Sequence, residues 1–530
     1  MSIDKVLKIH FIGIGGIGVS ALARLFLLGG KDWVMKNFGK VLDAQTAIGA
    51  EKFLITGSDL VESEVVLDLR KLGAEIAVGV HKKENLCLCH AELVSASSIN
   101  VVDSGSAMPR MVRGAAAGMT ITDNPDLIVY SAAVPKDNPE LKEAKKLKIL
   151  CLSYAQVVGE LTKKMFTIAI SGMHGKSTTT AMLALVLEKA GLDPTVIIGT
   201  KLKQWDGANA RLGKSQYLVI EADEWQASFL NYWPKIIVLT NIEEEHLDYY
   251  RDLPHIMKIF QEYLGHLPAD GYLVANGDDE NIKKIFNFQF LISKQFPTSN
   301  SKNYELKTKN FSWFSLRQIE AKELRRVLQI PGQHNISNAL AVLSAARILG
   351  VKDEIIFQAL SEFTGTWRRF EESYLKIKNY KSKMVSGGKP LKIISDYGHH
   401  PTEVKATLQA AKEKYPDKKI WVLFQPHQYQ RTYYLFDRFV DSFDQADGLI
   451  LMKIYDVAGR ETKELKQKVS SAKLAQAIRE RDQRRGVVRP ILTVDDLDQA
   501  KKLIVSNVVE ADILIVMGAG DIYKILNSTF

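Results

Sequence analysis

One fifteen-residue stretch, FTIAISGMHGKSTTT at 166–180, restricts the fold of this chain more than any other. The apolar, β-branched run from Phe166 to Ile170 predicts a buried strand, and apolar residues at helical spacing from Met182 onward predict a helix. A glycine-containing turn between them is typical of a loop that binds phosphate oxygens through backbone N–H groups at a helix N-terminus. The stretch therefore predicts an α/β domain with a site for a nucleoside triphosphate.

The residues of this loop suit the chemistry of triphosphate binding. Gly172 and Gly175 allow close backbone approach, Lys176 supplies positive charge, and the Ser177 hydroxyl can ligate Mg²⁺. A strict phosphate-loop motif has glycine where this chain has Ile170, so a glycine-rich turn with a chance Lys-Ser pair is the alternative. We favour the nucleotide site because the flanking strand and helix are the context that the motif requires.

Length and composition set the broad class. A chain of 530 residues exceeds what one hydrophobic core serves, which predicts about three domains. Its 46% hydrophobic and 25% charged residues are typical of a globular protein. The first apolar segment is interrupted by the glycines of 13–18, so we expect neither a signal peptide nor membrane insertion, and a cytoplasmic protein.

Cysteine usage and charge exclude two further classes. Cys87, Cys89 and Cys151 are too few for a disulfide framework, and the spacing of the first two with His90 is not that of a zinc site. The net charge of +9 is spread along the chain without a dense basic block, which argues against nucleic acid and favours a small anionic substrate. The sequence carries no signal of oligomeric state.

A second glycine motif lies near the N-terminus. Gly13-Ile14-Gly15-Gly16-Ile17-Gly18 follows an apolar strand at 6–12 and precedes a helical run at 20–28, which predicts a diphosphate at a helix N-terminus. Taken alone, it indicates a nicotinamide or flavin site. The acid expected about 20 residues later comes late, as Asp59, so residues from about 30 to 51 form a predicted insertion. Asp59 either binds ribose or uridine, or caps a helix over 61–72.

The rest of the first domain is less patterned. Residues 86–120 show no sustained period and are predicted to be a surface insertion. A strand pattern returns at 127–131, a helix starts at 137–140, and the domain ends near Tyr154.

Acidic residues and a histidine follow two strands of the central domain. Glu221-Ala222-Asp223-Glu224 comes after a strand at 217–220, and Asn241 to His246 comes after another at 236–240. Ligands bind at the carboxyl ends of strands in open α/β sheets, so these side chains suit Mg²⁺ held against a triphosphate. His246 alone would be read as a surface histidine, but beside Asn241 and the phosphate loop we favour a functional role.

Polar residues near the end of the central domain are further candidates. Asn335 or Asn338 either reaches an adenine edge or caps the helical run that follows. Arg368 and Arg369 lie near a predicted domain junction, where arginine is suited to phosphate.

The third domain repeats the pattern. Predicted strands at 391–395, 420–424 and 513–517 are each followed by a polar cluster, at 396–401, 425–432 and 518–521. All three clusters are expected to face one cleft. His399 and His400 could be a metal pair, but neighbours on an extended segment point apart, which favours substrate contact or structure.

Together these motifs resemble those of the Mur ligase family of cytoplasmic cell-wall enzymes. Nine segments carry the resemblance, in the family's order: HFIGIGGIG, SGMHGKSTTT, EADE, TNIEEEHLD, PGQHNISNA, RRFE, DYGHHPTEV, FQPHQYQRT and GAGD. The resemblance implies three α/β domains: a Rossmann-like UDP-binding domain at 1–154, a central P-loop ATPase-type domain at 155–364 and a C-terminal Rossmann-like domain at 365–530. It also replaces the dinucleotide of the first glycine motif by a UDP-sugar.

The resemblance assigns roles to individual residues. The UDP-sugar site would contain Gly13, Gly15, Gly16, Ile17, Gly18, Ser58, Asp59, His81 and Ser131. The ATP site would contain Gly172, Met173, His174, Gly175, Lys176, Ser177, Thr178, Asn335 and Arg369, and the Mg²⁺ ligands would be Ser177, Glu221 and His246. Tyr397 and His427 would contact substrate, and the catalytic residues would be Lys176, His246, Asp396, His399 and Arg431.

The activity implied is ATP-dependent ligation of L-alanine to the carboxylate of UDP-N-acetylmuramate through an acyl phosphate. Within the family the rival is a recycling ligase that attaches a murein tripeptide, because Trp225 and Gln226 stand where serine and aspartate are usual. Outside it, a nicotinamide-dependent oxidoreductase would leave the ATP loop unexplained, and a P-loop ATPase would leave the third domain's clusters unexplained.

Overall fold

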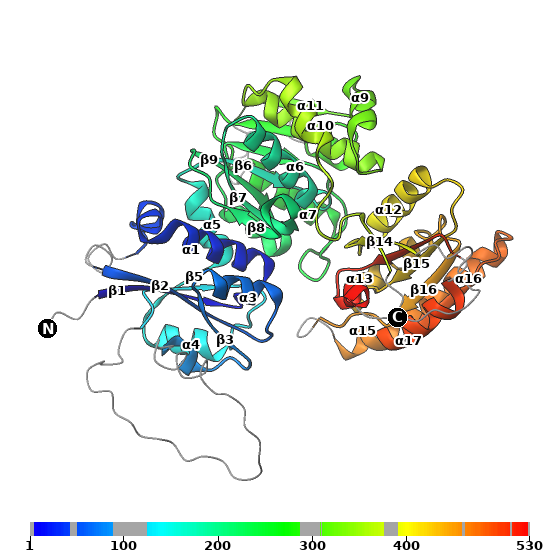
Figure 1. Cartoon of the computed structure of the whole chain (residues 1–530), viewed down its shortest axis with the longest axis horizontal. Coiled ribbons are helices and arrows are strands. Elements are labelled where there is room, and N and C mark those ends of the chain that lie inside the picture. Colours follow the sequence, from blue (N-terminus) through cyan, green and yellow to red (C-terminus); the bar gives the residue numbers. More distant parts are fainter. Residues whose placement is uncertain are drawn as a thin grey trace, which may run out of the picture. The chain divides into compact units, whose positions relative to one another are not determined.

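The computed structural model describes most of the chain as helices and strands in three sheets (Figure 1). The described residues are 5–42, 50–87, 124–286, 308, 310–375, 391–457, 462–508 and 511–527. The predicted α/β class is therefore confirmed. Most of the predicted insertion at 86–120, with Cys89 and His90, lies outside the described residues. Among the described helices, none is long and apolar enough to cross a membrane.

The chain forms two compact units. The first extends to Met165 and includes residues 209–212, and the second holds Phe166–Ala208 and the chain from Gly213 onward. The five-stranded sheet lies in the first unit. The other two sheets lie in the second unit, except that residues 209–211, in the last strand of the seven-stranded sheet, are counted with the first unit. The three-domain division with boundaries at 154 and 364 stays a prediction.

The sheet of the first unit has five parallel strands in the order β3-β2-β1-β4-β5. Its strands are β1 (Lys5–Ile12), β2 (Ala50–Asp59), β3 (Glu75–Val78), β4 (Leu127–Tyr130) and β5 (Leu150–Ser153). Its helices are α1 (Ile17–Phe38), α3 (Glu64–Lys71), η1 (Lys83–Cys87), α4 (Pro139–Lys146) and α5 (Tyr154–Thr162). The strand order reverses between β1 and β4, which is where open α/β sheets bind ligands.

Helix α1 is longer than the predicted run at 20–28. A second helical segment reaches Phe38 after Gly30, whose φ of 62° is not helical, so two helical segments meet at a kink there. Glycine can adopt this conformation because it has no Cβ. The first part of the predicted insertion at 30–51 is therefore helical, and residues 43–49 lie outside the described part of the chain.

The first sheet of the second unit has seven strands in the order β12-β11-β10-β6-β9-β7-β8. Its strands are β6 (Phe166–Ser171), β7 (Thr195–Leu202), β8 (Ala208–Arg211), β9 (Tyr217–Ala222), β10 (Ile236–Leu239), β11 (Tyr272–Asn276) and β12 (Asn310–Phe314). Its helices are α6 (Lys176–Lys189), η2 (Lys203–Trp205), η3 (Trp225–Asn231), α7 (Leu253–Leu264), α9 (Glu320–Val327), α10 (Gln333–Ile348) and α11 (Asp353–Ser361).

The central position of β6 explains its composition. The strand lies between β10 and β9, and α10 and α11 pack against α6 above it. Ile168 and Ile170 are fully buried in the same core as Val186 and Leu340. A strand covered on both faces reads as a continuous apolar run. Each such side chain contributes about 1.5–3 kcal/mol through burial, so the strand that carries the phosphate loop is firmly held.

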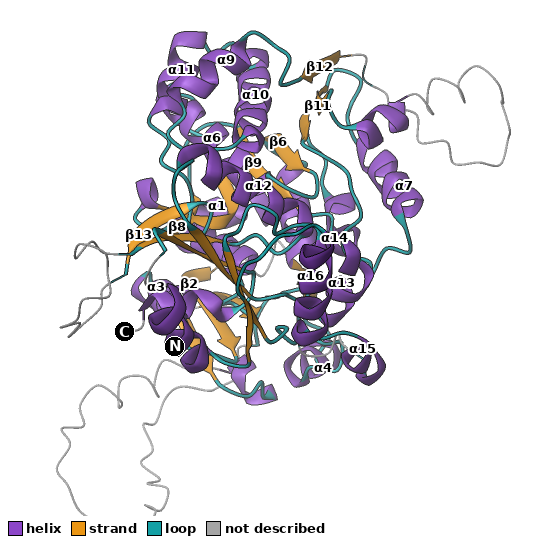
Figure 2. Cartoon of the chain, turned by 90° about the vertical axis from the view of Figure 1, so that its right-hand side faces the viewer, coloured by secondary structure: helices purple, strands orange, loops and turns teal. Residues whose placement is uncertain are grey.

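The second sheet of this unit has six strands in the order β13-β14-β18-β15-β16-β17. Its strands are β13 (Glu371–Tyr374), β14 (Lys392–Asp396), β15 (Ile420–Phe424), β16 (Gly448–Met452), β17 (Ile491–Val494) and β18 (Ile513–Met517). Its helices are α12 (Pro401–Lys414), α13 (Tyr429–Tyr434), α14 (Phe436–Val440), α15 (Lys463–Lys468), α16 (Ser471–Arg484), α17 (Leu497–Leu503), η5 (Ile504–Val508) and η6 (Asp521–Asn527). β13 is antiparallel to β14, and the other pairs are parallel. Figure 2 shows the described helices in purple and the strands in orange.

Candidate active site

The phosphate loop joins β6 to α6 in a shape that requires glycine. Gly175 is the N-cap of α6 with a φ of 83°, and Gly172 has a φ of 132°. A Cβ on Gly172 would lie 2.1 Å from the Thr240 Oγ1 atom. The loop therefore turns tightly against the end of β10 and presents the N-terminus of α6, including Ser177 and Thr178, as a site for an anion.

Asn241 holds the loop in this shape. Its Oδ1 atom accepts hydrogen bonds from the backbone N–H groups of Met173 (3.1 Å) and His174 (2.9 Å). Its Nδ2 group donates to the His174 carbonyl at 2.9 Å. Asn241 was not among the predicted site residues, although its position directly after a strand beside β6 is a signal that could have identified it.

Lys176 is paired with a buried carboxylate. Its Nζ atom lies 2.6 Å from the Glu224 Oε2 atom and 2.8 Å from the Gly172 carbonyl. The Glu224 side chain is 1% exposed, and its Oε1 atom is 3.3 Å from His246 Nε2. Burial alone would lower the pKa of Lys176, but the neighbouring carboxylates, Glu224 foremost, raise it. The lysine is therefore a fixed cation at the loop.

Two predicted Mg²⁺ ligands lie side by side. The Ser177 hydroxyl donates to Glu221 Oε2 at 3.1 Å, and the Gly199 N–H donates to Glu221 Oε1 at 2.6 Å. Hydroxyl and carboxylate oxygens are the ligands that Mg²⁺ prefers. The third predicted ligand, His246, pairs instead with Glu224, and its buried Nδ1 atom has no hydrogen-bond partner among the described residues.

Helix α10 brings asparagines to the same loop. The N-cap of α10 is Gly332, so neither Asn335 nor Asn338 caps the helix, and the capping interpretation is wrong. Asn335 donates to the Pro331 carbonyl at 2.7 Å. A Cβ on Gly175 would lie 2.5 Å from Asn338 Oδ1, so Asn338 packs directly on the loop.

His174 connects the loop to the C-terminal sheet. Its Nε2 atom is 2.6 Å from Glu243 Oε1, and its Nδ1 atom is 3.5 Å from Glu403 Oε1 at the start of α12. Burial alone would lower the pKa of His174, but the two carboxylates raise it to about 10. His174 is therefore a cation that bridges two acids, neither of which was predicted as a site residue.

Glu403 also organises the predicted residues before α12. It accepts hydrogen bonds from the His399 N–H at 2.9 Å and from Arg369 Nη1 at 3.2 Å. The Arg369 guanidinium lies over the Tyr397 ring, 5.1 Å from its centroid. Asp396 is buried and accepts from the Gly398 and Phe370 N–H groups at 2.7 and 2.9 Å, while burial raises its pKa. Two predicted residues, His399 and Arg369, thus bond to Glu403, and Tyr397 contacts Arg369.

The remaining predicted residues of this sheet lie near Arg431. Arg431 donates to Glu245 Oε1 through Nη2 at 2.6 Å and Nε at 2.8 Å, and to the His427 carbonyl at 3.0 Å. The His427 ring stacks on Tyr455, with centroids 5.3 Å apart. A hollow beside Arg431 and Glu245 is lined by Glu245, His246, Leu247, Asp248, Gln428, Gln430, Arg431 and Leu435.

The predicted residues of the first unit lie at the carboxyl ends of its strands. Asp59 accepts a hydrogen bond from the Gly15 N–H at 2.7 Å, and the Gly13 N–H donates to the Ser58 carbonyl at 2.9 Å. Ser63, not Asp59, caps α3, so the capping interpretation of Asp59 is wrong. A Cβ on Gly13 would lie 3.3 Å from the Ser131 Cβ atom, which places β4 beside the same glycine turn.

Glu140, a residue that was not predicted, ties this region together. Its Oε2 atom accepts from Ser58 Oγ at 2.8 Å and lies 2.9 Å from His10 Nε2. Its Oε1 atom lies 2.7 Å from His81 Nδ1 and accepts from Asn85 Nδ2 at 2.9 Å. Burial would raise the pKa of Glu140, but these bonds lower it to about 2. The sequence predicted that Glu140 lies at the start of a helix, but it gave no signal of the residues to which Glu140 bonds.

The fold and this site define a nucleotide-binding α/β protein in which a phosphate loop lies beside a second α/β sheet rich in arginine and histidine. Three family models match the chain: "Mur ligase family, catalytic domain" at 48–165, "Mur ligase middle domain" at 170–346 and "Mur ligase, glutamate ligase domain" at 382–520. The chain belongs to the Mur ligase family.

Curated relatives support this assignment, and solved structures share the fold. The chain is 36% identical over 527 residues to the UDP-N-acetylmuramate–L-alanine ligase of Clostridium botulinum, covering 98% of this chain and 97% of that protein. It is 34% identical to the ligase of the same name from Acetivibrio thermocellus, covering 98% and 95%. The crystal structure of UDP-N-acetylmuramate-alanine ligase from Thermotoga maritima has a TM-score of 0.65 at 23% identity, covering 98% and 97%. A murein peptide ligase from Psychrobacter arcticus has a TM-score of 0.60 at 20% identity, covering 98% and 97%.

Proposed function

We propose that this protein is an ATP-dependent ligase that joins L-alanine to the carboxylate of UDP-N-acetylmuramate in peptidoglycan precursor synthesis. The observation that carries the proposal is the identity of 34–36% to L-alanine ligases over nearly the whole length of both chains. The phosphate loop, the acidic residues beside it and the Arg431 region supply the chemical groups that such a reaction needs. A cytoplasmic location follows, because this is where nucleotide-linked precursors and ATP are available.

The reaction has two steps. The substrate carboxylate attacks the γ-phosphorus of ATP, which forms an acyl phosphate and releases ADP. The amine of L-alanine then attacks the acyl carbon, inorganic phosphate leaves, and the amine gives up a proton. Phosphoryl transfer depends on positioning and charge neutralisation more than on covalent help from the protein. No enzyme nucleophile is required.

The second unit provides this neutralisation. Lys176 and the N-terminus of α6 would bind the β- and γ-phosphates. Arg369 lies near the loop, because it bonds to Glu403, which also contacts His174 of the loop. Ser177 and Glu221, whose oxygens are 3.1 Å apart, fit Mg²⁺, and the unpartnered Nδ1 atom of buried His246 is a further candidate ligand. When bound, the ion would screen the triphosphate charge.

The C-terminal sheet would bind the amine substrate. Burial lowers the pKa of His399 to about 3, so its imidazole is neutral and can accept a hydrogen bond from the incoming amine. Arg431 pairs with Glu245 in this structure and would exchange this partner for the carboxylate of the amino acid. Asp396 has both oxygens occupied by backbone N–H groups, so its role in this proposal is to shape the Arg369 and Tyr397 segments.

Release of inorganic phosphate tests the proposal. We expect release only when ATP, UDP-N-acetylmuramate and L-alanine are all present. The rate with L-alanine is compared with the rates when glycine, L-serine or a murein tripeptide replaces it. Phosphate release without the UDP-sugar would contradict the ligase assignment and favour a simple ATPase. A preference for the tripeptide would favour the recycling ligase, which Trp225 and Gln226 keep open because they follow β9 next to Glu224.

A further inference from the structure

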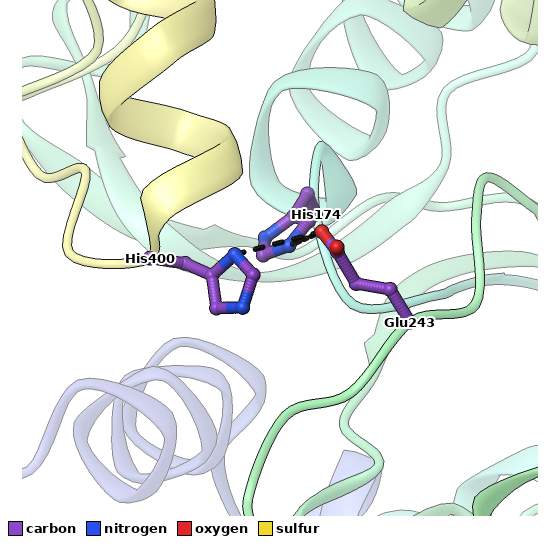
Figure 3. A group of neighbouring side chains, drawn as sticks. All are labelled: His174, Glu243 and His400. Atoms are coloured by element: carbon purple, nitrogen blue, oxygen red, sulfur yellow. Dashed lines mark hydrogen bonds and ion pairs between the residues drawn. The ribbon is translucent and has the colours of Figure 1, made fainter. Parts of the chain in front are cut away.

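Three side chains from separate segments converge behind the phosphate loop. His174 lies in the loop, Glu243 follows β10, and His400 is the N-cap of α12 (Figure 3). One ligand atom from each lies within 4.8 Å of the other two. The ligase reaction proposed above does not use these three residues as a set.

One oxygen of Glu243 faces both imidazoles. Its Oε1 atom is 2.6 Å from His174 Nε2 and 3.5 Å from His400 Nδ1. Its Oε2 atom is engaged separately, by Arg438 Nη2 at 2.6 Å and Thr402 Oγ1 at 3.0 Å. The carboxylate is therefore held with one oxygen directed at the two rings.

The other nitrogen of each ring is also held. His174 Nδ1 is 3.5 Å from Glu403 Oε1, and His400 Nε2 is 3.2 Å from the Glu244 carbonyl. Histidines that bind metals typically donate their second N–H to a carboxylate or a carbonyl, which fixes the ring and its tautomer. The backbone N–H of Thr402 donates weakly to His400 Nδ1 at 3.3 Å, so this nitrogen carries a lone pair.

We propose that His174, Glu243 and His400 form a binding site for a zinc-type divalent ion, separate from the Mg²⁺ site assigned to Ser177 and Glu221. Two imidazoles and a carboxylate suit Zn²⁺ or Co²⁺, whereas Mg²⁺ prefers oxygen ligands. The ion replaces the proton that lies between His174 and Glu243, and this proton is released to solvent. Water completes a four-coordinate shell around the ion.

Occupation of this site has a mechanical consequence. The ion would bond the phosphate loop directly to the start of α12, and so to the C-terminal sheet. Ligases that bind nucleotide and amine on different elements need those elements to move during turnover. We therefore expect the ion to inhibit, an expectation that rests on the proposed ligase function, whereas metal binding itself does not.

Titration of metal into the full-length protein tests the site. Protein stripped with EDTA is titrated with CoCl₂ in a nucleotide-free buffer, and ZnCl₂ is then added to displace the cobalt. We expect one ion per chain, with the intense visible absorption of four-coordinate Co²⁺. His400→Asn removes the imidazole but keeps a side-chain acceptor at the N-cap, and should weaken binding by at least about tenfold.

His255→Asn, in α7, is the matched control and should bind the ion as the unmodified protein does. Equal affinity of His400→Asn and His255→Asn, or no bound cobalt in the unmodified protein, would overturn the site.

Inhibition is measured separately, as phosphate release at fixed free Zn²⁺ and saturating Mg-ATP. Zn²⁺ should slow the unmodified protein and the His255 variant and spare His400→Asn, each relative to its own rate with Mg-ATP and no Zn²⁺. Binding without inhibition would overturn the locking effect alone. Absence of ligase activity with Mg-ATP and no added Zn²⁺ would instead overturn the proposed function, and the cobalt titration would still decide the metal site.

Discussion

Glu140 in the first unit and Glu224 in the second are both buried acids beside a glycine turn, but their partners differ. Glu140 bonds to a serine, an asparagine and two histidines that come from four different segments. Glu224 pairs with Lys176, which would bind the triphosphate, and with His246, which is a candidate metal ligand. The same residue type thus serves as a structural tie in one unit and as an exchangeable counter-ion in the other.

The largest expected effect follows from removing Lys176, the cation that pairs with Glu224. Lys176→Ala should lower the rate of phosphoryl transfer by about 10³-fold or more, because the substitution removes a positive charge that stabilises the transferred phosphate. Binding of UDP-N-acetylmuramate should be largely retained, since its predicted residues lie in the other unit. Phosphate release and UDP-sugar affinity measured on the same preparation check both statements, and unchanged turnover would refute the assignment of the loop.

Glu140→Gln should act on stability instead. The substitution removes the charge while keeping the shape, and leaves His10, His81 and Ser58 with an amide that cannot satisfy them all. We expect a loss of about 3 kcal/mol in the free energy of unfolding of the first unit. Urea unfolding is the measurement, and ATP affinity is the control. A stable variant with lost ATP binding would reverse the contrast between the two acids.

The same acid predicts a dependence on pH. The pKa of Glu140 is about 2 in the folded protein, below its ordinary value of 4.5, so the ionised form stabilises the fold. The stabilisation, about 3 kcal/mol, is fully present above pH 4.5 and is lost as the pH falls toward 2. Unfolding free energies measured across this window should fall more steeply for the unmodified protein than for Glu140→Gln.

The smallest effect is expected at the glycine turn of the first unit. A Cβ on Gly15 would lie 2.9 Å from Asp59 Oδ2 and 3.2 Å from Val66 Cγ2, so Gly15→Ala requires small shifts of these two side chains. We expect UDP-N-acetylmuramate to bind about fivefold more weakly, equivalent to about 1 kcal/mol. Isothermal titration of the UDP-sugar measures this change. A loss of phosphoryl transfer with normal sugar binding would contradict it.

The fold was largely predictable because its strands are buried on both faces and read as apolar runs. Phe166 to Ile170 and 513–517 match the observed strands closely. Residues that directly follow these strands could be placed in the site for the same reason. The second helical segment of α1 was not predicted, because residues after Gly30 were interpreted as an insertion.

The partners of the charged residues could not be predicted. Glu140 and Glu403 each read as an ordinary acid in the first turn of a helix, and Glu243 as one of three consecutive acids. Many of their bonds join residues that are far apart in the sequence, such as Glu140 with Asn85, 55 positions apart, and His174 with Glu403, 229 positions apart. Only the folded sheets determine which of these side chains meet.

Asn241 has a consequence for the speed of nucleotide capture. Its amide group supplies bonds that shape the phosphate loop, so that shape is encoded in the chain itself and is reached when β10 pairs with β6. A nucleotide that arrives meets backbone N–H groups already in position and loses little affinity to ordering the loop. Association should therefore follow a single exponential under excess nucleotide, and Asn241→Ala should add a slower second phase.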